Sequence, residues 1–143
     1  DKVRIKLNVL AETVRGKRVV LVDDSIVRGT TSARIVKLLR EAGATEVHMR
    51  SSAPPFLNPC YYGTDIDSKE NLIACKHTIE EIGKIIGADS LGYLDINHLN
   101  MLIGNPPGEG YCHACFSGEY PTDVPNTAAK NRFEKKISEK EEK

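Results

Sequence analysis

The sequence is poor in aromatic residues and cysteine. Only 6% of its residues are aromatic, tryptophan is absent, and there are four cysteines among 143 residues. Four cysteines are too few for a disulfide scaffold in a chain of this size, so we expect cytoplasmic thiols or metal ligands. No apolar run approaches the roughly 18–20 residues that cross a bilayer, and the first residues lack the pattern of a signal peptide. We therefore expect no membrane partner.

The sequence also lacks an excess of charge of one sign. It has 20 Lys and Arg residues and 20 Asp and Glu residues, which gives no electrostatic reason to expect nucleic acid as a partner. With 40% hydrophobic and 28% charged residues, the composition is that of a globular protein. The length favours one domain. We expect it over residues 1–125, followed by a charged C-terminal helix or tail over residues 126–143.

A strand, a loop and a helix follow one another in the first third of the chain. Residues 18–24 form an apolar run that ends in two acids, which predicts a central parallel strand buried on both faces. Beyond a loop that contains Gly29, Thr31 and Ser32 are candidate N-cap residues of a helix. Gly43 is suited to end this helix in a left-handed conformation.

A second strand is predicted at residues 46–51, and the whole unit has the order of a right-handed parallel crossover. The sequence therefore predicts an α/β fold with a parallel sheet flanked by helices. Few strands are evident against the roughly 5–6 of an average sheet, so we expect an incomplete sheet. Further predictions are helices at residues 68–75, 78–86 and 96–103 and a short strand at residues 90–94.

Two acids stand where ligands bind in open parallel sheets, directly after the first strand. A helix N-terminus follows, and its free N–H groups suit a phosphate. Carboxylates such as Asp23 and Asp24 accept hydrogen bonds from sugar hydroxyls or hold a divalent ion. An isolated Asp-Asp pair more often only ends a strand and caps a turn. The whole run of residues 19–32 favours a site for a phosphorylated sugar, and it is not a Walker A loop.

Residues 20–32 resemble the phosphoribosyl pyrophosphate (PRPP) loop of type I phosphoribosyltransferases. Residues 24–31, Asp-Ser-Ile-Val-Arg-Gly-Thr-Thr, are similar to the form found in the amidophosphoribosyltransferase family. The resemblance extends from about residue 4 to residue 122, with supporting matches at residues 4–8, 40–44, 62–65 and 86–89.

The resemblance implies formation of 5-phosphoribosylamine from PRPP and ammonia released from glutamine, the first committed step of purine synthesis. It implies that Asp23 and Asp24 contact the ribose hydroxyls and help position Mg²⁺ with PRPP. Lys6 is either a contact to the pyrophosphate or an ordinary solvated lysine. Purine nucleotides as feedback inhibitors and a homo-oligomer are also implied. The residues expected to hold the 5-phosphate lie between 25 and 32 and include Ser25, Arg28, Gly29, Thr30, Thr31 and Ser32.

The cysteines form a second candidate site. The Cys112-x-x-Cys115 motif follows a Gly/Pro loop at residues 105–110, and from the residues alone it fits a redox pair, a zinc half-site or a cluster half-site. Cys60 lies in a loop, whereas Cys75 lies in a helical pattern typical of a buried structural thiol. A four-cysteine zinc site that uses Cys75 stays possible.

The family resemblance implies a [4Fe–4S] cluster instead, as in one subgroup of the family. Cys60, Cys112 and Cys115 match three of its ligands, and the fourth lies outside this sequence.

Parts of the family pattern are missing. The sequence contains neither the family's glutaminase domain nor the first part of its phosphoribosyltransferase sheet, so we expect a C-terminal fragment that is inactive alone. Two alternatives are a salvage phosphoribosyltransferase that acts on a nucleobase and a PRPP-sensing regulator of the same fold without enzymatic activity.

Overall fold

The computed structural model describes residues 9–66, 68–103 and 111–124. The predictions made for Lys6, for the loop at residues 105–110 and for the tail at residues 126–143 lie outside these residues.

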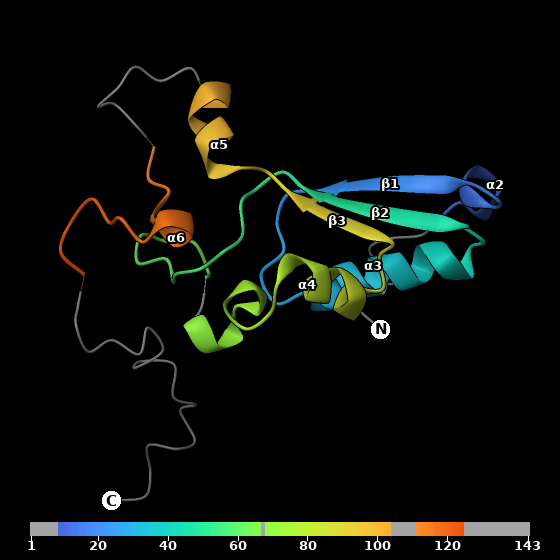
Figure 1. The fold of residues 1–143 in the computed structure, drawn as a ribbon, viewed down its shortest axis with the longest axis horizontal. Coiled ribbons are helices and arrows are strands. Elements are labelled where there is room, and N and C mark those ends of the chain that lie inside the picture. Colours follow the sequence, from blue (N-terminus) through green and yellow to red (C-terminus); the bar gives the residue numbers. More distant parts are fainter. Residues whose placement is uncertain (1–8, 67, 104–110, 125–143) are drawn as a thin grey trace, which may run out of the picture.

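The three predicted strands form one parallel sheet, which confirms the predicted α/β fold. Its strands are β1 (Arg18–Asp23), β2 (Glu46–Ser51) and β3 (Ser90–Tyr93). They lie in the order β1-β2-β3, so β2 is central. The helices α3 (Thr30–Glu41) and α4 (Ile79–Ile86) cover one face of this sheet (Figure 1).

Shorter helices lie around this sheet. The helix α2 (Ala11–Val14) precedes β1, α5 (Ile96–Ile103) follows β3, and α6 (Ala114–Ser117) lies near the last described residues (Figure 1). None of the helices in the described ranges is long and apolar enough to cross a bilayer.

The helix α3 begins earlier than the sequence suggested. Its N-cap is Gly29 in the left-handed conformation, rather than Thr31 or Ser32, and Ala33 N donates the first helical hydrogen bond to Gly29 O at 2.9 Å. The predicted end is confirmed, because Gly43 follows the helix with φ +98°. The left-handed glycine lets the chain leave the loop and enter the helix within one residue.

The first strand is not buried on both faces, so that prediction is wrong. Of the strands that the structure describes, β1 pairs with β2 alone, and its exposure alternates along the strand. Val20 is 63% exposed and Val22 is 67% exposed, on the face away from α3 and α4. Among the described residues, no element covers this face. A valine-rich run shows that a strand is apolar, but it does not show whether a second layer of helices covers the other face of the sheet.

Three hydrophobic clusters hold the elements together. The first lies between the sheet and α4, and the second joins α3 to β2. The third lies among the loops beyond the sheet. Their fully buried members include Met49, Val47 and Leu72, each 0% exposed.

The predicted helix at residues 68–75 is replaced by two 3-10 helices, Lys69–Asn71 and Ile73–Cys75. Leu72 separates them in an extended conformation and is fully buried. The extended backbone at Leu72, whose side chain packs with Phe56 and Ile66 in the loop cluster, interrupts the helical hydrogen-bond pattern. The prediction that Cys75 is buried is also wrong, because this residue is exposed.

The other predictions are close. The helix expected at residues 78–86 is α4, capped by Thr78. The helix at residues 96–103 is α5, and the strand expected at residues 90–94 ends at Tyr93.

Candidate functional site

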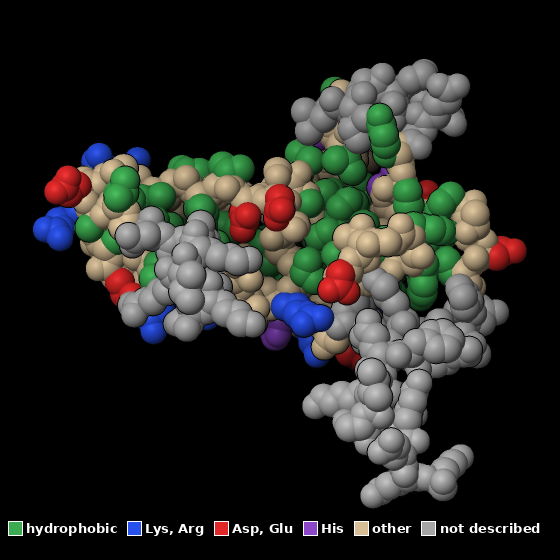
Figure 2. All heavy atoms as spheres, turned by 180° about the vertical axis from the view of Figure 1, so that it is seen from behind, with side chains coloured by type: hydrophobic (Ala, Val, Ile, Leu, Met, Phe, Trp, Pro, Cys, Tyr) green, Lys and Arg blue, Asp and Glu red, His purple; other side chains and the backbone are tan. Residues whose placement is uncertain are grey.

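A cavity of about 430 Å³ opens at the carboxyl end of β1. The whole run from Asp23 to Ser32 contributes to its wall, and Asp65 adds a side chain from a distant loop. The structure thus brings Asp23, Asp24 and the predicted phosphate loop into one cavity. In the view from behind, acidic side chains lie next to hydrophobic ones near the centre of the molecule (Figure 2).

The two acids are fixed by local hydrogen bonds. Asp24 N donates to Asp23 Oδ1 at 3.0 Å, and Ser25 Oγ donates to Asp24 Oδ1 at 3.0 Å. Asp23 is half-buried and Asp24 is exposed. Each carboxylate therefore keeps a defined position and still has lone pairs for a ligand.

Ser52 connects these acids to the end of β2. Its N–H donates to Asp23 O at 2.9 Å, and its Oγ donates to Asp23 O at 3.1 Å and to Asp24 O at 3.4 Å. Sequence reasoning did not identify Ser52. Its place directly after a strand that neighbours β1 was the available signal, because the ends of parallel strands meet at one edge of the sheet.

The loop after the acids is anchored in two clusters. Ile26 is 2% exposed in the cluster under α4, and Val27 packs against the loop cluster of Phe56, Ile66 and Leu72. Val27 O also accepts a hydrogen bond from Ile73 N at 2.9 Å. These contacts fix the backbone of the loop.

The helix end of the cavity suits an anion. The amides of Thr30, Thr31 and Ser32 open α3 and, by the geometry of an α-helix, have no acceptor within it. The positive end of the helix dipole lies there as well. Arg28, Thr30 and Thr31 are exposed, and Ser32 is only 2% exposed. This end can bind a phosphate, and the acidic end can bind hydroxyls or a cation.

Three of the four cysteines share one neighbourhood. Burial raises the pKa of the Cys115 thiol, and negative charge on Cys60 and Cys112 raises it further. Cys60 and Cys115 pack against the loop cluster. The thiol of the exposed Cys75 donates a hydrogen bond to Leu57 O at 3.3 Å. In the described ranges, no three His, Cys, Asp or Glu side chains converge on a single metal ion.

Fold and site together define a class: an α/β protein with a cavity between the end of a parallel strand and the N-terminus of the next helix. Such a place suits an anion. No family model matches the sequence. Two curated relatives are named amidophosphoribosyltransferase. The protein of Archaeoglobus fulgidus is 57% identical over 124 residues, which cover 86% of this chain and 27% of the relative. The Bacillus subtilis protein is 54% identical over 125 residues, which cover 85% and 26%.

Solved structures agree with these relatives. The glutamine PRPP amidotransferase of B. subtilis, complexed with ADP and GMP, matches with a TM-score of 0.76 and 52% identity, covering 83% of this chain and 27% of that one. A structure described as the allosteric regulatory enzyme of purine biosynthesis matches with a TM-score of 0.77 and 51% identity, covering 83% and 26%. The chain therefore spans about a quarter of the length of its relatives.

Proposed function

We propose that this chain supplies the PRPP-binding part of an amidophosphoribosyltransferase. The complete enzyme forms 5-phosphoribosylamine from PRPP and glutamine-derived ammonia in the first committed step of purine biosynthesis. The observation that carries the proposal is the cavity lined by residues 23–32. It occurs in a chain 54–57% identical to relatives with that name.

The two ends of the cavity match the two ends of the sugar. The loop and the first amides of α3 bind the 5-phosphate, and Asp23 and Asp24 accept hydrogen bonds from the ribose hydroxyls. Departure of pyrophosphate leaves positive charge on the sugar, which nearby carboxylates stabilise. Mg²⁺, when bound, neutralises charge on the leaving pyrophosphate. The acids hold Mg²⁺ together with PRPP, and Lys6 contacts the pyrophosphate.

The three clustered thiols fit a [4Fe–4S] cluster. Such a cluster binds one thiolate at each iron, so its ligands lie further apart than those of one ion. The contribution of Cys60 and Cys112 to the raised pKa of Cys115, beside its burial, supports such a grouping. The fourth ligand comes from outside this chain.

A substitution at one cluster ligand tests this part of the proposal. Cys115→Ser in the complete enzyme lowers bound iron and acid-labile sulfide, whereas the exposed Cys75→Ser serves as the matched control. Equal iron in both variants, or stoichiometric zinc without iron, would contradict the cluster.

The remaining proposals concern partners. A glutaminase part outside this chain supplies ammonia. Purine nucleotides inhibit the enzyme, in line with the ADP and GMP bound to the B. subtilis relative. The complete protein is a homo-oligomer in the cytoplasm.

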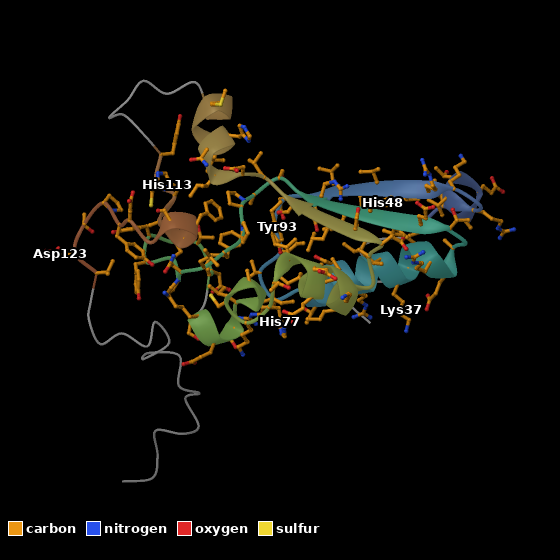
Figure 3. The ribbon with its side chains drawn as sticks, viewed as in Figure 1. Lys37, His48, His77, Tyr93, His113 and Asp123 are labelled. Atoms are coloured by element: carbon orange, nitrogen blue, oxygen red, sulfur yellow. The ribbon has the colours of Figure 1, made fainter. Side chains whose placement is uncertain are left out.

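An enzyme chimera tests the main activity. This chain replaces the matching quarter of the B. subtilis enzyme, and PRPP-dependent turnover is compared with that of the Asp24→Asn variant. We expect a loss of about 100-fold or more, because a carboxylate is removed beside developing positive charge. The control is Asp123→Asn, an exposed position after α6 (Figure 3). Unchanged kinetics in Asp24→Asn would refute the assigned role, and turnover of a free nucleobase in place of ammonia would favour a salvage enzyme.

A further inference from the structure

Asp65 is a third carboxylate in the wall of the cavity. It comes from the loop after β2 and meets the phosphate loop only in the folded chain. Asp23 and Asp24 each accept a hydrogen bond from the loop. Asp65 is exposed and makes no hydrogen bond or ion pair with any residue that the structure describes. Its oxygens are therefore available to a ligand.

The position of Asp65 is fixed by the next residue. Ile66 is 3% exposed and belongs to the loop cluster, against which Val27 of the phosphate loop also packs. Ile66 N donates to Thr64 O at 2.8 Å, and Cys60 N donates to Ile66 O at 3.2 Å. One apolar cluster thus holds both the phosphate loop and the turn that carries Asp65.

Charge selects the part of the ligand that Asp65 meets. Among the residues that the structure describes, the wall has three carboxylates and one cationic side chain, Arg28. A carboxylate repels phosphate, and the amides of α3 attract it. The favoured orientation of a phosphorylated sugar therefore keeps its phosphate at α3. The charge of Asp65 is compatible with the opposite end of the ligand, at which positive charge develops during the reaction.

We propose that Asp65 binds and orients the attacking ammonia, an inference that rests on the proposed function. The carboxylate accepts a hydrogen bond from one N–H and directs the nitrogen lone pair toward the anomeric carbon. The new C–N bond forms as pyrophosphate leaves with the electron pair of the broken C–O bond. The nitrogen is then a cationic ammonium group. Asp65 accepts its extra proton, which leaves the neutral amine, and later returns that proton to water.

The test uses the chimeric enzyme with ammonium chloride in place of glutamine. Asp65→Asn keeps the size of the side chain and removes its charge and basicity. We expect PRPP affinity within about twofold of the parent, and kcat/KM for ammonia about 100-fold lower. The Asp65→Glu variant, which keeps the carboxylate, recovers part of this loss. Asp123→Asn is the matched control, and circular dichroism checks the fold of each variant.

The outcomes separate this inference from the proposed function. Full kcat/KM for ammonia in Asp65→Asn, or a loss confined to PRPP affinity, would overturn the role of Asp65 and leave the proposed function intact. A folded parent chimera that binds no PRPP would overturn both. A lower kcat/KM for ammonia with intact PRPP binding, partly recovered by Asp65→Glu, supports the assignment.

Discussion

Gly29 determines the shape of the phosphate loop at the scale of a single residue. Its φ is +77°, a conformation that side chains disfavour. A Cβ there would lie 2.8 Å from Ile73 Cδ1 and 3.5 Å from Ile86 Cγ2. Ile73 is itself hydrogen-bonded to the loop through Val27 O. A side chain at Gly29 would therefore push on the residue that holds the loop.

We expect Gly29→Ala to lower the free energy of unfolding by more than the left-handed conformation alone would cost. That conformation costs about 1–2 kcal/mol for a residue with a side chain. Gly16→Ala is the matched control, since Gly16 has φ +72° and no atom within 4 Å of its added Cβ. Urea unfolding of both variants measures the difference. Equal losses would mean that Ile73 moves aside without cost.

The turn before β3 connects elements through one carboxylate. Asp89 Oδ2 accepts hydrogen bonds from Val47 N at 2.6 Å and from Arg40 Nη2. Arg40 also donates to Thr45 O at 2.9 Å. The end of α3, the start of β2 and the approach to β3 are therefore joined at Asp89.

Acid should weaken this connection. The hydrogen bond from Val47 N lowers the pKa of Asp89 below its ordinary value of 3.8, and Arg40 lowers it further. Because the folded pKa is below the unfolded one, the stabilisation is complete above the ordinary value and disappears as pH falls through the folded pKa.

We expect Asp89→Asn to be less stable than the parent at pH 7, and the two unfolding curves to converge below pH 3.8. Denaturant unfolding at a series of pH values measures this. Asp123→Asn, at an exposed position, serves as the control. A stability difference that is independent of pH would contradict the role given to the Asp89 charge.

At the scale of the whole molecule, the sheet has two unlike faces. Helices cover one face, and Val20 and Val22 are exposed on the other. His48 is paired in register with Val20 and lies on the same uncovered side, whereas Lys37 points away from the sheet on the far side of α3 (Figure 3). An exposed apolar strand at the edge of a sheet favours self-association.

Substitution of both valines by threonine should reduce self-association of this chain and its binding of a hydrophobic dye. Its free energy of unfolding should change by no more than about 0.5 kcal/mol per site, because these positions are exposed. Val47→Thr, at a position with 0% exposure, is the contrasting variant and should destabilise the fold by burying a hydroxyl. Light scattering and dye fluorescence measure the outcome. Unchanged scattering in the double variant would argue against this face as the cause.

The sequence predicted the positions of helices and strands better than it predicted which of their residues are buried. Local apolar patterns located the strands, and the acids with the following loop identified the cavity, because both signals are local. The exposure of β1 depends on which layers lie beside it, and local sequence does not contain that information. Ser52 hydrogen-bonds to the backbone of the two acids and Asp65 lines the cavity. Both come from other segments, so their proximity is seen only in the folded chain. The burial of Leu72, which divides the expected helix at residues 68–75, is likewise a tertiary effect.

The double anchoring of the phosphate loop, through Ile26 and Val27, determines how the cavity meets a ligand. A receptor whose backbone is already held loses little conformational entropy when it is occupied. The affinity should then depend on the contacts that the ligand makes, because little conformational entropy is lost in ordering the loop. Association should proceed in one kinetic phase.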